Sequence, residues 1–224
     1  MLSLENEYEN KIILVDKPIN ITSADAVYIL KRKLRLKKAG HAGTLDPRAT
    51  GLLIICTDKM TKRINEFMEC EKEYEGVIRI GAETKSYDTE SEEEGHKDVT
   101  HITKKDLIAA RETFLGDIYQ VPPMYSALKF KGKPLYKLAR KGKTIERKPR
   151  KVNIKKFEIE RKYETELWFD IVCSKGTYIR SLAHDFGEKL GVGAYLKSLK
   201  RIRIGDFMLE NLNQDIDGLK FRVV

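Results

Sequence analysis

The sequence contains few of the residues that build disulfide-rich, zinc-binding or membrane-spanning proteins. Its 224 residues include only three cysteines, four histidines and one tryptophan. Cys56, Cys70 and Cys173 are widely spaced and form no Cys-x-x-Cys pair, which favours reduced thiols in a cytoplasmic protein. The polar first ten residues lead us to expect no signal peptide. No apolar run approaches the roughly 20 residues that cross a bilayer.

Acidic residues are also in deficit, with 34 Asp and Glu against 43 Lys and Arg, a formal charge of +9. A surplus of this size points to a polyanionic partner, most simply nucleic acid. Eleven residues between 129 and 151 are Lys or Arg, only Glu146 is acidic, and aromatic residues are interleaved. Cations neutralise phosphates and aromatic rings stack on bases, so Lys129, Lys131 and Lys133 are candidate RNA contacts. A solvated surface is the alternative interpretation.

Strands and helices mix along the chain without a regular βαβ rhythm, which predicts an α+β fold with a mostly antiparallel sheet. Apolar periodicity and capping residues predict strands at 11–15, 52–56, 74–80, 152–163, 167–173 and 199–207. They also predict a helix that begins at Thr22 or Ser23, a helix over 59–69, a helix that begins at Thr103 and is stopped by Gly116, and a helix over 177–190. An acidic loop is expected at 86–98, a basic hairpin with a short helix at 128–136, and no clean domain boundary is visible.

Residues 40–53, Gly-His-Ala-Gly-Thr-Leu-Asp-Pro-Arg-Ala-Thr-Gly-Leu-Leu, form the most informative stretch. One carboxylate, Asp46, lies in a loop with three glycines and a proline, directly before an apolar strand. Glycine allows tight turns and proline fixes φ, so this pattern indicates a rigid loop at a strand end, where reactive groups are often placed. The alternative is an Asp-Pro turn whose carboxylate only caps backbone amides.

A second cluster, Cys-Ser-Lys-Gly-Thr-Tyr-Ile-Arg at 173–180, has the character of a strand-to-helix junction. Gly176 breaks the strand, and Thr177 is expected to cap the helix that follows. Taken alone, Arg180 has the pattern of a surface helix residue. Together with the Asp46 loop and Lys-Glu-Tyr at 72–74, it completes a recognisable set.

In these residues the sequence resembles the TruB family of tRNA pseudouridine-55 synthases. The match is colinear over nearly the whole chain. It comprises Asp16-Lys17-Pro18, the Gly-Thr-Leu-Asp-Pro-x-Ala-Thr-Gly pattern at 43–51, Tyr74, Gly81, Thr84, Asp88, Pro-Pro-Met-Tyr-Ser-Ala at 122–127, residues 174–180 and residues 193–201.

The resemblance implies a pseudouridine synthase fold, with a mixed, largely antiparallel sheet, flanking helices and a central cleft. It implies a catalytic domain over 1–210, with a thumb-like basic insertion at about 126–151, and a short C-terminal tail over 211–224. Many relatives carry an additional RNA-binding domain of the PUA type, for which there is little room here. The expected partner is the T stem-loop of tRNA. We expect no membrane association and no obligate protein partner, and we expect the protein to be a monomer.

The resemblance also assigns roles to individual residues. Asp46 is the expected catalytic aspartate, Arg180 is expected to pair with it, and Tyr74 is expected to stack on the target base. Tyr74 is also a candidate for proton transfer at C5. His41 is expected to contact the loop nucleotides, Tyr178 and Leu199 to line the uracil pocket, and Lys17 to support the catalytic strand.

The implied reaction is a cofactor-free isomerisation of uridine 55. It agrees with the lack of a dinucleotide fingerprint or a phosphate-binding loop motif. The scattered histidines predict no metal site. Two alternatives stay open, a noncatalytic module that binds the T arm and an RNA-guided, dyskerin-like synthase. Retention of Asp46, Tyr74 and Arg180 favours the enzyme.

Overall fold

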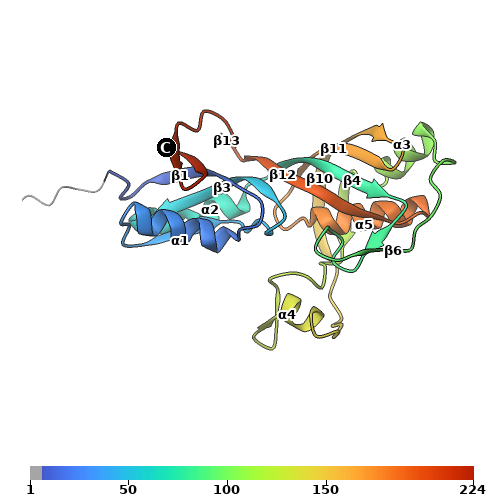
Figure 1. Cartoon of the computed structure of the whole chain (residues 1–224), viewed down its shortest axis with the longest axis horizontal. Helices are drawn as coiled ribbons and strands as arrows, with labels where there is room; N and C mark the ends of the chain where they lie inside the picture. The colour runs from blue at the N-terminus through green and yellow to red at the C-terminus, as the bar shows by residue number, and fades with distance from the viewer. Residues whose placement is uncertain (1–6) are drawn as a thin grey trace, which may run out of the picture. The chain divides into compact units, whose positions relative to one another are not determined.

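A computed structural model describes residues 7–224, which form two compact units (Figure 1). Unit 1 holds the described residues up to Glu75 together with Leu199–Val224, and unit 2 holds Gly76–Ser198. The division falls within two strands, β4 (Lys72–Ile80) and β12 (Ala194–Ile204), each of which runs from one unit into the other. This explains why no linker composition marks it in the sequence.

The sheet of unit 1 is mixed. Its strand order is β14 (Gln214–Ile216), β15 (Leu219–Val223), β1 (Ile12–Lys17), β3 (Thr50–Thr57) and the end of β12, with β2 (Ala39–Ala42) paired to β3. β3 is antiparallel to β1 and β2 and parallel to β12. The expected α+β class is confirmed. β14 and β15 lie within 211–224, so this stretch extends the sheet, and the division at residue 210 stays a prediction.

Side-chain alternation along β1 builds a core on each face of this sheet. Ile13 and Val15 pack with Leu30 of α1 (Ser23–Lys33), and Ile12 and Leu14 pack with Phe67 of α2 (Ile64–Glu69). The two helices therefore cover opposite faces. α1 begins after Thr22, whose hydroxyl accepts from the Asp25 N–H while the Asp25 carboxylate accepts from the Thr22 N–H.

Unit 2 is built on the strand order β4, β11 (Glu166–Cys173), β10 (Arg150–Tyr163) and β7 (Gly116–Gln120). β10 is antiparallel to both of its neighbours. Phe186 of α5 (Ile179–Leu190) packs edge-on against Phe157 of β10 at 5.7 Å, and α5 also contacts α3 (Lys104–Glu112). In the acidic loop, β6 (Glu93–Glu94) pairs with β5 (Glu83–Thr84), which precedes the loop, and Asp88 forms an isolated bridge with Leu196 of β12.

The basic insertion folds as the sequence predicts, into a hairpin and a short helix. β8 (Lys129–Phe130) pairs with β9 (Lys133–Pro134), and α4 (Leu135–Ala139) follows directly. Figure 1 shows α4 projecting from the strands of unit 2. Lys129, Lys131 and Lys133 are all exposed.

Several element boundaries differ from the expected ones. The helix expected over 59–69 starts as the 3-10 helix η1 (Asp58–Arg63) and becomes α-helical only at Ile64. The expected helix from Thr103 ends at Glu112, while Gly116 opens β7 in a left-handed conformation.

Two further boundaries are corrected at the ends of α5 and β12. Tyr178, not Thr177, is the N-cap of α5, because the Thr177 hydroxyl donates to the Ser174 carbonyl instead. The last long strand, expected over 199–207, begins at Ala194 and ends at Ile204, and a turn at Gly205 separates it from β13 (Phe207–Met208).

Candidate active site

The Asp46 loop of unit 1 joins β2 to β3 and is held on both sides of the carboxylate. The Ala49 N–H donates to the Asp46 carbonyl at 3.0 Å, which closes a tight turn. One residue earlier, the Leu45 N–H donates to the Ser23 hydroxyl at 2.9 Å, and that hydroxyl donates to the Leu45 carbonyl at 3.2 Å. Ser23 is buried in the first turn of α1. The half-buried Asp46 therefore projects from a backbone that is fixed by this turn and by Ser23 of α1.

A buried arginine lies beneath this loop. Arg201 of β12 is 2% exposed, and its guanidinium donates to the Leu52 carbonyl at 2.8 Å and to the Gly43 carbonyl at 3.0 Å. The two acceptors flank the loop at the end of β2 and the start of β3. Arg201 therefore ties the two ends of the loop together and places a fixed positive charge under it.

Lys17 supplies a second buried cation, at the end of β1. Its ammonium donates to the Pro18 and Ile21 carbonyls, each at 2.9 Å, and the side chain is fully buried. Burial lowers the pKa of Lys17 to about 8, and the negative charge of Asp46 limits this fall. Lys17 therefore stabilises the loop before α1 and interacts electrostatically with Asp46, and its support of the catalytic strand stays a prediction.

His41 of β2 is half-buried, and its Nδ1 atom has no hydrogen-bond partner among residues 7–224. Burial lowers the pKa of His41, and the charge of Arg201 lowers it further. The imidazole is therefore neutral near pH 7 and keeps an unused polar atom. Such a group is available for a hydrogen bond to a bound ligand.

Tyr74 and Leu199, two further expected residues, also lie in unit 1. Tyr74 of β4 is buried at 9% exposure, and Leu199 of β12 is half-buried beside β3, where its carbonyl accepts from the Thr50 hydroxyl at 3.3 Å. Two residues before Tyr74, the buried Lys72 ammonium donates to the Phe67, Met68 and Cys70 carbonyls at the end of α2. This side chain fixes the start of β4, which carries Tyr74.

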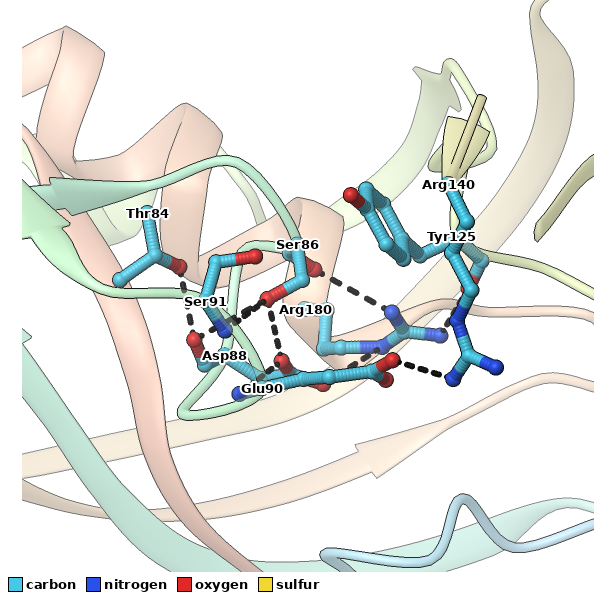
Figure 2. A network of polar contacts seen from close by, with 8 residues as sticks. All are labelled: Thr84, Ser86, Asp88, Glu90, Ser91, Tyr125, Arg140 and Arg180. Carbon is cyan, nitrogen blue, oxygen red and sulfur yellow. Dashed lines mark hydrogen bonds and ion pairs between the residues drawn. The ribbon is translucent and has the colours of Figure 1, made fainter. Parts of the chain in front are cut away.

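Arg180, in unit 2, is held in a network of polar contacts that Figure 2 shows. Its guanidinium donates to the Ser86 carbonyl at 3.2 Å and to the Tyr125 carbonyl at 2.7 Å. Its Nε lies 3.6 Å from the Asp88 carboxylate, and both side chains are nearly buried, at 5% and 8% exposure. Arg180 is therefore not the surface helix residue that its pattern alone suggests.

The Asp88 carboxylate is fixed in its turn by the loop around it. Its Oδ1 accepts from the Ser86 hydroxyl at 2.6 Å and from the Glu90 N–H at 2.9 Å. The Glu90 carboxylate pairs with Arg140, next to α4, at 2.6 Å. One connected network thus joins α5, the loop at 84–91 and the basic insertion (Figure 2).

Gln120 positions Tyr178. The buried Gln120 amide accepts from the Tyr178 N–H at 2.7 Å and donates to the Tyr178 carbonyl at 3.0 Å. These bonds fix the backbone of Tyr178, the residue at the start of α5. The Tyr178 ring and Arg180 therefore project from a backbone that is held in place. Nothing in the local sequence marks Gln120 for this role, because it lies 58 residues away.

The structure thus distributes the expected residues between the two units. Unit 1 contains Asp46, Lys17, His41, Tyr74 and Leu199, and unit 2 contains Arg180, Tyr178, Lys129, Lys131 and Lys133. The pairing of Arg180 with Asp46 stays a prediction. Sequence reasoning gave no role to Arg201, Gln120 or Lys72. It noted Asp88 only as part of a motif.

Residues 7–224 contain no group of three or more His, Cys, Asp or Glu side chains arranged to hold a metal ion. No helix in this part of the chain is long and apolar enough to cross a membrane. The functional groups described for unit 1 are the Asp46 carboxylate, the buried cations Lys17 and Arg201, the neutral His41 imidazole and the Tyr74 ring. A carboxylate held among cations is suited to act as a nucleophile or a general base.

Comparison with known proteins finds relatives that match most of the chain. The chain is 46% identical over 202 residues to the tRNA pseudouridine synthase B of Clostridium tetani, covering 90% of this chain and 70% of the relative. It is 47% identical over 214 residues to that of Flavobacterium johnsoniae, covering 92% and 93%. Among solved structures, a Cbf5-Nop10-Gar1 complex contains a chain with a TM-score of 0.71 and 29% identity. That alignment covers 91% of this chain and about half, 51%, of the other.

A family model supports the same assignment. Residues 31–179, which include the Asp46 loop, Tyr74, Asp88 and the basic insertion, match the TruB family pseudouridylate synthase (N terminal domain). The solved structures share the mixed sheet with helices that is described above. The chain therefore belongs to the TruB family of pseudouridylate synthases, which are isomerases.

Proposed function

We propose that this chain converts uridine 55 in the T loop of tRNA to pseudouridine, without a cofactor, with Asp46 as the catalytic group. The observation that carries the proposal is the Asp46 loop itself, a carboxylate on a fixed turn above two buried cations. The relatives named as tRNA pseudouridine synthases support tRNA as the substrate, since they share 46–47% of aligned residues with this chain.

The reaction must break the C1′–N1 bond of uridine and form a C1′–C5 bond, while C5 loses a proton and N1 gains one. Atoms balance without a redox partner or a group donor. The Asp46 carboxylate either attacks C1′ or removes the C2′ proton, and both routes need it ionised. Lys17, which interacts electrostatically with Asp46, supplies positive charge near the carboxylate.

The remaining residues act on the flipped nucleotide in this proposal. Tyr74 stacks on the target base and offsets part of the few kcal/mol that base unstacking costs. Arg180 pairs with Asp46 and stabilises its negative charge. Tyr178 and Leu199 line the uracil pocket, in the expected central cleft. His41, whose Nδ1 is unused, accepts or donates a hydrogen bond to a loop nucleotide.

RNA binding is assigned to the basic insertion, which exposes Lys129, Lys131 and Lys133. A hairpin loop with splayed bases is easier to read than an A-form stem, which agrees with the T loop as target. We propose that the enzyme acts as a monomer in the cytoplasm, with no obligate protein partner.

Two alternatives are separated by the test. A noncatalytic T-arm module would bind tRNA without chemistry, and an RNA-guided synthase would need a guide RNA. The RNA-guided hypothesis is based on the Cbf5-Nop10-Gar1 complex, which contains a 29% identical chain. This chain covers only about half, 51%, of that chain. The hypothesis of a tRNA-modifying enzyme is based on relatives of which the alignments cover 70% and 93%.

The experiment measures tritium release from unmodified tRNA that carries [5-³H]uridine, together with the tRNA dissociation constant. Wild type is expected to release tritium from position 55 alone, and Asp46→Asn to release none while still binding. Asp206→Asn, an exposed aspartate in a turn of the same unit, is the matched control and should keep full activity. Tight binding without release by wild type would establish the binding module. Release only with added guide RNA would establish the guided enzyme.

A further inference from the structure

Helix α5 contacts the loop at 84–88 at two points, one helical turn apart. The first point is Arg180, which holds Ser86 and Asp88. The second is His184, four residues later on the same helix face, whose imidazole stacks on the Tyr87 ring. The ring centroids are 3.9 Å apart and the planes are 9° from parallel. Tyr87 lies between the two residues that hold Arg180.

The backbone at Tyr87 is unusual. Its φ is +62°, a left-handed conformation that costs an aromatic residue free energy. Two backbone bonds hold it there, from the Tyr87 N–H to the Thr84 carbonyl at 3.1 Å and from the Leu196 N–H to the Tyr87 carbonyl at 2.9 Å. In this conformation the Ser86 carbonyl and the Asp88 carboxylate point toward Arg180 (Figure 2). The Tyr87 ring at the same time reaches His184.

The His184 contact is a stack and not a hydrogen bond. The buried Nδ1 of His184 has no hydrogen-bond partner among residues 7–224. Burial lowers the pKa of His184, against the opposing charges of Asp185 and Glu188, so the ring is neutral near pH 7. Two half-buried rings at stacking distance therefore anchor the loop through their faces.

We infer that Tyr87 and His184 are positioning residues for the isomerase reaction, which act through Ser86 and Asp88 to fix the guanidinium of Arg180. The inference rests on the proposed function, because it takes Arg180 as part of the catalytic site. Arg180 meets this loop through a 3.6 Å ion pair with Asp88 and a hydrogen bond to the Ser86 carbonyl, so the position of the loop affects the position of the guanidinium. The stack gives the Ser86–Asp88 turn a second contact with α5, in addition to Arg180.

The test compares single-turnover rates of pseudouridine formation with tRNA dissociation constants. Tyr87→Asn removes the ring while accepting the left-handed backbone, and His184→Ala removes the other ring. Each is expected to lower the rate by about ten-fold, equivalent to about 1.4 kcal/mol, and to change tRNA affinity by less than about two-fold. Tyr87→Phe and His184→Phe keep a stack, so they should restore the rate to within about two-fold of wild type.

A double-mutant cycle separates positioning from a general loss of structure. In an Asp88→Asn background, where the group that the stack orients is already altered, Tyr87→Asn should add less than about two-fold to the rate loss. Circular dichroism melts keep every assay below the unfolding transition. If Tyr87→Asn unfolds, His184→Ala carries the same cycle.

Unchanged rates in Tyr87→Asn and His184→Ala, with active wild type, would overturn the inference and leave the proposed function intact. A full multiplicative loss in the Asp88→Asn background would also overturn it, because that is the result of a purely structural contact. A wild type that releases no tritium would overturn the proposed function, and this inference with it.

Discussion

Gly51 lies directly against the backbone of Arg201, its partner in the parallel register of β3 and β12. A Cβ atom on Gly51 would come within 2.3 Å of the Arg201 carbonyl oxygen, and the Gly51 φ is +99°. The same Arg201 donates from its side chain to Leu52 and Gly43. The residue that fixes the Asp46 loop is therefore itself placed by a contact that only glycine permits.

Gly51→Ala is expected to destabilise the protein by about 3 kcal/mol or more, from backbone strain together with displacement of β12. Urea unfolding followed by circular dichroism measures the change. Gly218→Ala is the matched control, since Gly218 has a φ of +81° in the same unit but open space around its Cβ direction. It should cost only about 1–2 kcal/mol. Equal losses in the two variants would show that strain alone acts at Gly51.

The Lys72 ammonium is expected to stabilise the end of α2. Lys72→Met would leave the Phe67, Met68 and Cys70 carbonyls without this donor, at a cost of about 2–3 kcal/mol. Because these carbonyls precede β4, the activity of the variant should fall as well. Lys62→Met, at an exposed site in η1, is the control and should change stability by less than about 0.5 kcal/mol. An unchanged stability of Lys72→Met would mean that water replaces the ammonium as donor to these carbonyls.

Features set by neighbouring residues were predictable from the sequence. The Thr22 and Thr103 capping boxes each join residues three apart, and both helices begin where they predict. The alternation of β10 and β11 and the basic hairpin are likewise local. The mixed sheet and the family followed from the colinear motifs.

Features set by distant residues were not predictable. Thr177 has the chemistry of a cap, but α5 begins after Tyr178, whose backbone is held by Gln120 of β7. The roles of Arg201 and Asp88 depend on acceptors and donors brought together by the fold, Gly43 for one and Arg180 for the other. Composition and periodicity do not encode such pairings, because any buried polar side chain needs a partner but the sequence does not name it.

The depressed pKa of Lys17 predicts a pH dependence of stability. Below about pH 8 the ammonium is charged in both the folded and the unfolded chain, and its burial costs free energy. Between about pH 8 and 10.5 the folded chain loses the proton first, so the unfolded chain binds more protons and the free energy of unfolding rises with pH.

Lys17→Met is expected to lose this rise. Urea midpoints of wild type and Lys17→Met, measured from about pH 7.5 to 10.5, should therefore separate increasingly in favour of wild type as pH increases. Lys11→Met, at an exposed residue next to the same strand, should run parallel to wild type. Parallel curves for Lys17→Met would contradict a depressed pKa.

The exposed lysines of the basic insertion are expected to contact phosphates. Changing Lys129, Lys131 and Lys133 together to Gln should weaken tRNA binding and reduce the slope of log K against log salt by about 2, because each lost phosphate contact removes about 0.7–0.9. Filter binding over a salt series measures both quantities. Lys104, Lys105 and Lys189, exposed on helices of the same unit, give a control triple with the same change in net charge. An equal loss in both triples would indicate general charge attraction, whereas a changed slope in the first triple alone would place the insertion on the RNA.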